Sequence, residues 1–214
     1  MQYRGTISGH RAILLAILLI AGALRLAPLA SDVRFHPDEA LFTAFARDAV
    51  AHGDWLLHGD LDKTPLSLYA NAVSLTLVAA TYDRGVPDFD PRVGEFAARV
   101  PGVFASWLQV AAVYALAKRL YQRQDVARWA ALFMALSPLA IAYGASAYTD
   151  GLMLLFSTVS LWLCAADRPL TAGIALALAF ASKQQALYFL PLCAALLIER
   201  RGRWCVVWHC SRHR

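Results

Sequence analysis

Long apolar segments dominate this chain and exclude a soluble globular fold. Of the 214 residues, 59% are hydrophobic and only 16% are charged, and the mean hydropathy is +0.47. A helix needs roughly 20 apolar residues to cross a bilayer core about 30 Å thick. The first such run, from Ala12 to Ala30, is long enough and has no convincing cleavage site, so we interpret it as a retained anchor. The composition predicts an all-α, polytopic integral membrane protein.

The remaining apolar runs predict further crossings. We expect membrane helices over residues 100–117, 129–143, 151–166 and 171–198. The last is interrupted by Ser182-Lys183-Gln184-Gln185, which predicts two short helices that meet at Lys183 on the non-cytoplasmic side. A charged residue in the middle of an apolar stretch is a functional candidate by default.

Charge patterning predicts the orientation. The net charge of +5 comes from dispersed basic residues, which indicates loop topology and no nucleic-acid partner. Arg4, Arg11 and the basic loop 118–128 place the N-terminus in the cytoplasm, whereas residues 31–98 carry eleven acidic and five basic residues and should lie outside. Arg25 is expected to extend to the interface, and Arg99 to anchor a helix there.

Residues 65–81 are apolar but do not fit a full crossing. The run is short, and Ser67, Asn71 and Ser74 form a polar stripe along one side. A crossing here would also place the downstream basic loops outside. We therefore expect a juxtamembrane helix, partly sunk in the interface.

The longest polar stretch, Phe35 to Leu66, carries most of the candidate chemistry. Pro37 suits the first turn of a helix, followed by Asp38 and Glu39 where the helix dipole favours negative charge. The helix should run to about Ala51, with Gly53 past its end. At helical spacing, Asp38 falls within the apolar face formed by Leu41, Phe42, Phe45 and Ala49, and Glu39 lies at its edge.

By topology alone, several ionisable residues converge on the non-cytoplasmic side: Asp38, Asp62, Lys63, Asp150 and Lys183. This combination suits sugar transfer from a lipid phosphate. A lysine can neutralise a phosphate and stabilise it as it leaves, and a carboxylate can deprotonate an acceptor hydroxyl. A single displacement would invert the anomeric carbon.

Five short motifs resemble those of the GT-C membrane glycosyltransferases, in the branch of protein mannosyltransferases, aminoarabinose transferases and Rgt-like enzymes. They follow in order: Asp38-Glu39 after the first helix, Gly53-Asp54-Trp55 with Asp62-Lys63-Thr64-Pro65-Leu66, Phe96-Ala-Ala-Arg99-Val-Pro101, Leu136-Ser137-Pro138 with Thr149-Asp150, and Ser182-Lys183. The sequence departs from the branch at Asp62 (commonly Glu), Thr64 (commonly Pro) and Gln184 (commonly Gly).

The resemblance implies a GT-C helical bundle that transfers sugar from a polyprenyl-phosphate donor to a lipid, polysaccharide or protein acceptor. It implies Asp38 as general base, Lys63 and Lys183 as ligands of the donor phosphate, and Asp150 as a second acid. A divalent metal near Glu39, Asp62 or Asp150 is a further candidate. The Ala-, Leu- and Arg-rich composition fits a bacterial source, and the resemblance then implies a site on the periplasmic side of the inner membrane.

Other interpretations stay open at this level. The same charges could line the path of a flippase or transporter for a lipid carrier. Residues 1–202 correspond to the N-terminal part of a GT-C module. Residues 203–214 form a basic tail that looks frame-shifted or disordered. The chain would then be an inactive fragment. The four cysteines form no disulfide framework, and a zinc site at Cys205, His209 and Cys210 matches no strong spacing pattern.

Overall fold

The computed structural model describes residues 3–31, 34–55, 65–79, 81–83, 86–88 and 91–199. The elements in chain order are α1 (Tyr3–Leu26), η1 (Ala27–Ala30), α2 (Pro37–His52), α3 (Pro65–Ser74), η2 (Leu75–Ala79), β1 (Thr81–Asp83), β2 (Val86–Asp88), α4 (Pro91–Tyr121), α5 (Gln124–Leu136), α6 (Pro138–Gly144), α7 (Asp150–Ala165), α8 (Pro169–Ser182) and η3 (Gln184–Phe189). Helical structure continues from η3, giving an apolar helix over Gln184–Glu199.

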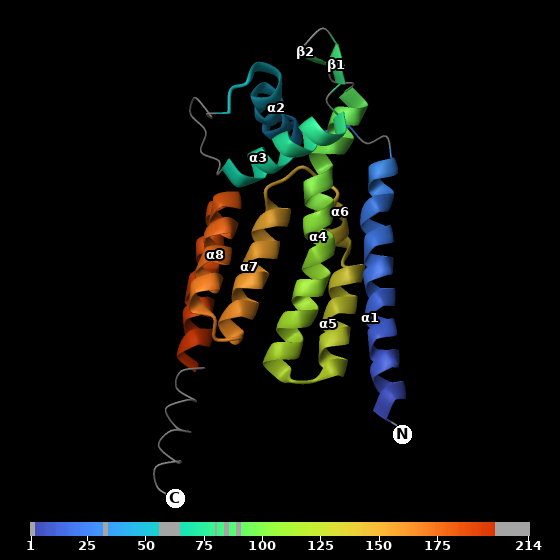
Figure 1. Cartoon of the computed structure of the whole chain (residues 1–214), viewed down its shortest axis with the longest axis vertical. Coiled ribbons are helices and arrows are strands. Elements are labelled where there is room, and N and C mark those ends of the chain that lie inside the picture. The colour runs from blue at the N-terminus through green and yellow to red at the C-terminus, as the bar shows by residue number, and fades with distance from the viewer. Residues whose placement is uncertain are drawn as a thin grey trace, which may run out of the picture.

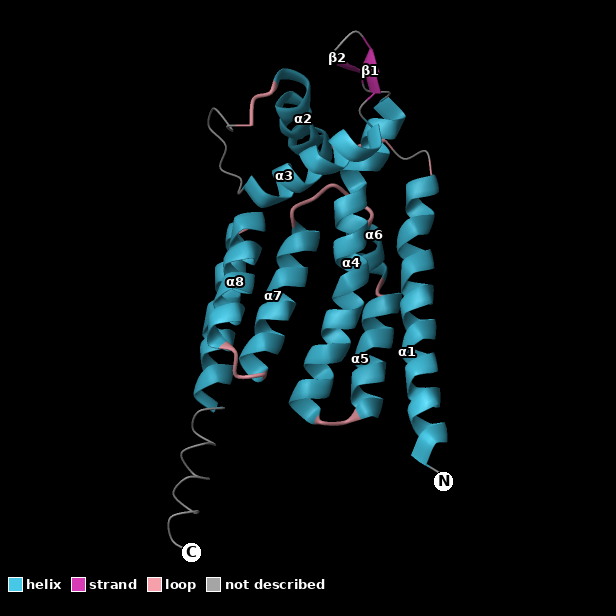
Figure 2. Ribbon diagram, in the orientation of Figure 1, coloured by secondary structure: helices cyan, strands magenta, loops and turns pink. Residues whose placement is uncertain are grey.

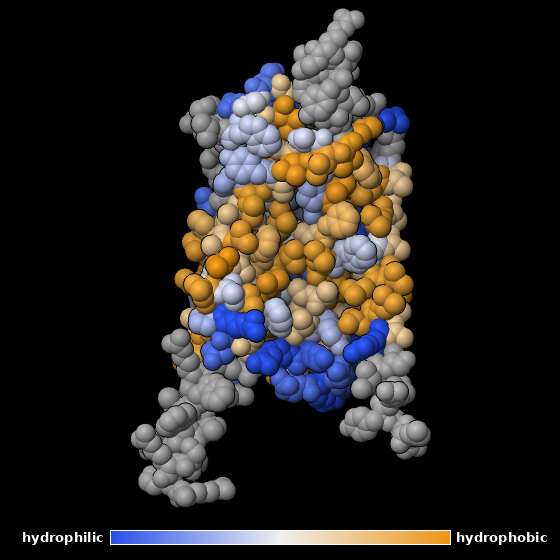
Figure 3. All heavy atoms as spheres, in the orientation of Figure 1, coloured by the Kyte–Doolittle hydropathy of each residue, from blue (hydrophilic) through white to orange (hydrophobic). Residues whose placement is uncertain are grey.

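The helices form a bundle with a cap at one end. Helices α1, α4, α5, α7 and α8 lie alongside one another, and α2, α3 and the β1–β2 hairpin lie at the upper end (Figure 1; Figure 2). Hydrophobic side chains cover the middle of the face in Figure 3, and hydrophilic ones gather at both ends. This arrangement confirms the predicted all-α membrane fold. The only strands in the described part are three residues each, paired antiparallel.

Two helices of the described part are long and apolar enough to span a membrane. They cover Arg11–Ala30 and Pro91–Tyr121, and the bent pair α5–α6 is a third if it counts as one span. Helices α7 and α8 and the Gln184–Glu199 helix are apolar but shorter. Helices α7 and α8 lie alongside α4 in Figure 1. That they cross the membrane remains a prediction from the sequence.

Helix α4 starts earlier than predicted and continues through a proline. It begins at Pro91, not near Val100, and contains Pro101 in its interior. Proline has no backbone N–H, so Pro101 leaves the carbonyl of Ala97 without its helical donor. The hydroxyl of Ser74 donates to that carbonyl at 2.6 Å, which lets the helix tolerate the proline and ties α3 to α4.

The segment predicted as one span over 129–143 is broken in two. Helix α5 ends at Leu136, α6 begins at Pro138, and the two are bent by 57°. The Ser137 hydroxyl accepts from the backbone N–H of Ala140 at 3.3 Å. A capping serine followed by proline therefore starts a new helix where the hydropathy pattern showed none.

Arg25 does not extend to the interface, so that expectation is wrong. Its side chain is fully buried. The guanidinium donates to the carbonyls of Met134 (2.9 Å) and Ala135 (3.0 Å) and to the Ser106 hydroxyl (2.8 Å). The last carbonyls of a helix lack helical donors and carry partial negative charge. Arg25 satisfies these groups at the end of α5, which is why burial is favoured over exposure.

The turn predicted at Lys183 is confirmed, and the polar stripe predicted for residues 65–81 lies on a buried side of α3. Residues 171–198 do form two helices that meet at Lys183, where the backbone is extended between α8 and η3. Helix α3 lies across the ends of α7 and α8 instead of beside them (Figure 1). Its polar stripe faces the protein, since Ser67, Asn71 and Ser74 are buried, while Leu77 in η2 is 80% exposed. Polar residues inside and apolar residues outside fit a helix sunk in the membrane interface.

Candidate active site

A cavity of about 690 Å³ lies at the capped end of the bundle. Helix α2, the loop between α6 and α7, and the tip between α8 and η3 form its walls. The residues that line it are His36, Asp38, Leu41, Phe42, Tyr143, Tyr148, Thr149, Asp150, Ser182, Lys183, Gln184 and Gln185. We call it the cap pocket. It brings together three residues that the sequence selected far apart along the chain: Asp38, Asp150 and Lys183.

Asp38 reaches this pocket because α2 begins where predicted. Pro37 occupies the first turn, and His36 is the N-cap, whose side chain accepts from the backbone N–H of Asp38. Gly53 ends the helix with φ of 70°, in the left-handed region. The Asp38 side chain is 66% exposed, and one of its carboxylate oxygens lies 3.9 Å from the His36 Nδ1. An accessible carboxylate on the pocket wall is suited to taking a proton from a bound hydroxyl.

The predicted assignment of faces on α2 needs correction. Asp38 and Leu41 line the pocket and are exposed. The buried residues of α2 are Glu39, Phe42, Thr43, Ala46 and Ala49, and of these only Phe42 also lines the pocket. The hydrophobic pattern alone could not separate a face that packs from a face that lines a cavity. The carboxylate directed into the protein is therefore Glu39 and not Asp38.

Asp150 and Lys183, which also line the pocket, form an ion pair. The Lys183 Nζ donates to both carboxylate oxygens of Asp150, at 2.7 and 2.9 Å. The Lys183 side chain remains 31% exposed and that of Asp150 33% exposed. Asp150 begins α7 and Lys183 follows α8, so the pair joins the two helix ends. An ammonium group held beside an open cavity is suited to contact an anionic ligand.

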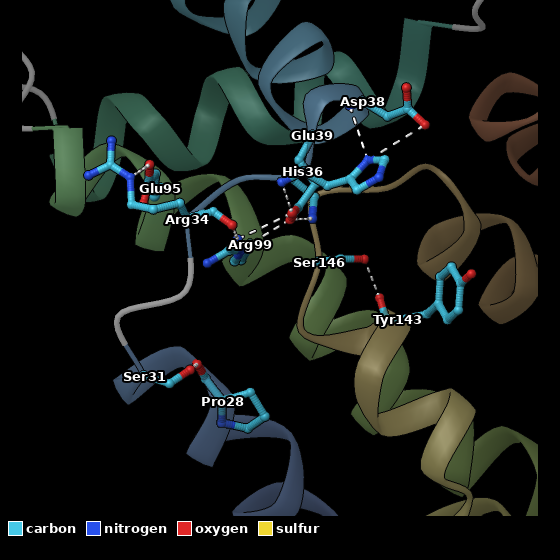
Figure 4. A network of polar contacts seen from close by, with 11 residues as sticks. Pro28, Ser31, Arg34, His36, Asp38, Glu39, Glu95, Arg99, Tyr143 and Ser146 are labelled. Atoms are coloured by element: carbon cyan, nitrogen blue, oxygen red, sulfur yellow. Dashed lines mark hydrogen bonds and ion pairs between the residues drawn. The ribbon is translucent and has the colours of Figure 1, made fainter.

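Glu39 lies behind this pocket and pairs with Arg99. The Arg99 Nε donates to Glu39 Oε1 at 3.0 Å and its Nη2 to Glu39 Oε2 at 3.2 Å. Figure 4 shows the Glu39 carboxylate directed toward Arg99 and the Asp38 carboxylate directed away from it. The sequence analysis placed Glu39 among the acidic residues of the site and Arg99 as an interface anchor. Instead, Arg99 is buried, and this pairing was not foreseen.

Electrostatics around Glu39 favour its charged form. Burial alone would raise the pKa of its carboxyl group. The hydrogen bonds from Arg99 and from the backbone N–H groups of His36 and Ala147 outweigh burial, so the pKa lies below its ordinary value. Glu39 is therefore held as a carboxylate with its hydrogen-bonding capacity used.

Aromatic residues form part of the pocket that the sequence did not identify. His36 and Tyr148 meet edge to face with ring centres 6.0 Å apart, and Tyr143 lies 5.8 Å from Tyr148. Partial burial and the negative charges of Glu39 and Asp38 raise the pKa of Tyr148. No local pattern distinguishes a tyrosine of a membrane belt from one beside a cavity.

The remaining candidates have different outcomes. Asp62 and Lys63 lie outside the described residues. Within the described ranges, no group of three or more His, Cys, Asp or Glu side chains is arranged to hold a metal. Of the carboxylates proposed near a metal, Asp150 pairs with Lys183 and Glu39 pairs with Arg99. Asp38 also lines the pocket.

Comparison with known proteins gives one match. A sequence model described as dolichyl-phosphate-mannose-protein mannosyltransferase matches residues 92–210, which is more than half of the chain. The match includes Asp150 and Lys183 but begins after Asp38. No curated protein and no solved structure matches the chain.

Proposed function

The chain belongs to the dolichyl-phosphate-mannose-protein mannosyltransferase family, a family of membrane glycosyltransferases of the GT-C type, and we propose that the cap pocket is its transfer site. In this proposal a polyprenyl-phosphate sugar is the donor and a hydroxyl group of a lipid, polysaccharide or protein is the acceptor. The observation that carries the proposal is the placement of Asp38 and the Asp150–Lys183 pair on the walls of one cavity.

Asp38 acts as the general base. It takes the proton of the acceptor hydroxyl as the oxygen attacks the anomeric carbon of the donor sugar. The bond from that carbon to the phosphate oxygen breaks, and the polyprenyl phosphate leaves with the electron pair. Because attack and departure occur on opposite faces, the anomeric configuration inverts. Proton removal by a positioned carboxylate typically contributes about 10²–10⁴-fold to the rate.

Lys183 binds the donor phosphate and stabilises it as it leaves. Its ammonium group is partly exposed on the pocket, so a phosphate oxygen can approach it. Asp150 orients Lys183 through two contacts and serves as the second acid of the site. Lys63 is assigned a second phosphate contact from the family resemblance alone, through the motif Asp62-Lys63-Thr64-Pro65-Leu66.

The arrangement of charges favours transfer at one membrane face over transport through the membrane. The cap pocket lies at the end of the helices that Figure 1 places opposite the α4–α5 turn. That turn follows Lys118 and Arg119, which the positive-inside rule assigns to the cytoplasm. The proposed site then faces the periplasm of a bacterial inner membrane.

The proposal is tested by transfer of labelled sugar from a polyprenyl phosphate in membranes that contain the chain. Asp38→Asn should lower the rate about 10²–10⁴-fold without changing the amount of protein. Asp48→Asn is a matched control, because Asp48 is an exposed carboxylate on the same helix whose partner is His52. Equal rates for Asp38→Asn and Asp48→Asn would disprove the role of Asp38. No transfer by the unsubstituted chain with any polyprenyl-phosphate sugar would disprove the function.

A further inference from the structure

We propose that Glu39 and Arg99 are positioning residues whose buried ion pair sets the separation between Asp38 and the Asp150–Lys183 pair across the cap pocket. The inference rests on the proposed function for its catalytic meaning, but its structural content stands on the contacts alone. Neither Glu39 nor Arg99 is among the described residues that line the pocket. Their effect on the site must therefore act through the residues they hold.

Glu39 joins three separate parts of the chain. Its carboxylate accepts from the backbone N–H of His36 at 2.9 Å, which fixes the start of α2. It accepts from the backbone N–H of Ala147 at 2.9 Å, in the loop between α6 and α7. It also accepts two hydrogen bonds from Arg99 of α4. Four donors on two oxygens leave this carboxylate little freedom to move.

Arg99 extends the same junction to the segment before α2. Its Nη2 also donates to the carbonyl of Arg34 at 3.3 Å, and its guanidinium lies over the Phe35 ring, 5.0 Å from the ring centre. Figure 4 shows this network between the segment before α2, α4 and the loop that contains Ser146. Residues 34–36 are thus held by both Arg99 and Glu39.

The junction lies next to both walls of the pocket. Asp38 is adjacent to Glu39 in the first turn of α2. Ala147 precedes Asp150 by three residues, and Asp150 in turn holds Lys183. One carboxylate therefore fixes the start of the helix that carries Asp38 and the loop that leads to Asp150. A shift at Glu39 changes the distance between the proposed base and the proposed phosphate ligand.

Burial makes the junction rigid. The Arg99 and Glu39 side chains are only 8% and 6% exposed, so the pair is largely shielded from solvent. Removal of one partner of a buried pair leaves an uncompensated charge in the protein. The chain is expected to rearrange around such a charge. Rearrangement of the segments on either side would widen the range of pocket geometries.

The first test measures the pocket geometry without any substrate. Spin labels are placed at Arg47→Cys on α2 and Tyr188→Cys beyond Lys183, both exposed, in a background in which the native cysteines are replaced by alanine. Double electron–electron resonance in nanodiscs then reports the distance between the two walls. Glu39→Gln should shift or broaden the distance distribution, because the amide NH₂ of glutamine cannot accept the hydrogen bonds that a carboxylate oxygen accepts.

Two further variants make this result interpretable. Arg99→Lys keeps the charge but loses the planar guanidinium that also contacts the Arg34 carbonyl and the Phe35 ring, so it should give an intermediate distribution if Glu39→Gln fails to fold. Glu95→Gln is the matched control, since Glu95 pairs with the exposed Arg34 at 3.1 Å and should leave the distribution unchanged. Distributions in Glu39→Gln and Arg99→Lys that are identical to the unsubstituted chain would overturn the proposal.

The second test uses the transfer reaction. Misplacement of reacting groups by about 1 Å can cost about 10²-fold, so Glu39→Gln should lower kcat about 10–100-fold per folded molecule. The donor KM should stay within about twofold because Asp150 and Lys183 remain paired. A purely structural role would lower the yield of folded protein but not its kcat. A higher donor KM with an unchanged kcat in Glu39→Gln would contradict the positioning role.

The two tests separate this inference from the proposed function. If the unsubstituted chain transfers no sugar, the proposed function fails and the spin-label distances still decide whether Glu39 and Arg99 set the pocket geometry. If the chain is active and the distances do not respond to Glu39→Gln, the function stands and the positioning proposal is overturned.

Discussion

Two ion pairs at the same end of this bundle differ in how much water reaches them. The Glu39–Arg99 side chains are 6% and 8% exposed, whereas those of Asp150 and Lys183 are 33% and 31% exposed. Glu39 accepts from four donors on three segments, whereas Asp150 is held by Lys183. The comparison indicates that opposite charges do not by themselves mark a ligand site. The accessible pair is suited to exchange a partner for a phosphate, and the buried pair is suited to hold the walls.

The most severe test of this comparison is removal of the buried cation. Arg99→Ala should lower the free energy of unfolding by about 3–5 kcal/mol, because Glu39 is left as a buried, unpaired charge. Denaturation in mixed micelles measures this effect. The control Arg34→Ala removes an exposed cation and should cost less than about 1 kcal/mol. Similar losses in the two variants would show that the difference in burial has no energetic consequence.

A second prediction moves the junction without touching any charge. A Cβ added at Gly102 would clash with the backbone oxygen of Ser146, which is next to the Ala147 N–H that donates to Glu39. Gly102→Ala should therefore displace the α6–α7 loop and destabilise the chain by about 1–3 kcal/mol, as overpacking usually does. The same spin-label distance would report the displacement. Gly173→Ala is the control, since nothing lies within 4 Å of a Cβ there.

The accessible pair should respond in activity more than in stability. Lys183→Met should raise the donor KM about tenfold, equivalent to about 1.4 kcal/mol of binding. Its free energy of unfolding should change by less than about 1 kcal/mol because the pair is partly solvated. Steady-state kinetics against donor concentration and micellar denaturation measure the two quantities. A loss of stability as large as that in Arg99→Ala would mean that the two pairs do the same work.

The smallest expected effect is that of acid on the buried pair. Because the folded-state pKa of Glu39 is lowered, its stabilising contribution is complete above the ordinary glutamate pKa of about 4.3. It is lost as the pH falls through the lower folded-state value. The unsubstituted chain should therefore lose more stability between pH 5 and pH 3 than Glu39→Gln does. Parallel losses in the two chains would place the acid sensitivity at other carboxyl groups.

Local patterns were enough to predict several elements of this protein. The bounds of α2 follow from Pro37 and Gly53, and the polar residues of α3 predicted its buried side. The position of Lys183 inside an apolar stretch predicted the turn between two helices. The sequence analysis also selected Asp38, Asp150 and Lys183, which are three of the residues that line the cap pocket. The predictions for Asp62 and Lys63 lie outside the described residues.

The failures share a physical cause, since each depends on a partner distant in the chain. Arg25 was expected at the interface, but the carbonyls at the end of α5 are more than a hundred residues away and hold it inside. Pro101 was expected to start a helix, but Ser74 accommodates it within α4. Glu39 was grouped with the site acids, but Arg99 and Ala147 direct it away from the pocket.

The sequence by itself therefore determined that this chain is an all-α membrane protein, and it selected Asp38, Asp150 and Lys183, which lie at one end of the described helices. Hydropathy and helix-capping residues act over a few turns, so a linear pattern records them. Only the tertiary structure decided which of the adjacent residues Asp38 and Glu39 faces the cavity. That choice depends on donors supplied by α4 and by the α6–α7 loop, and hydrogen bonds to a buried carboxylate outweigh the weak preference of one helix face over its neighbour.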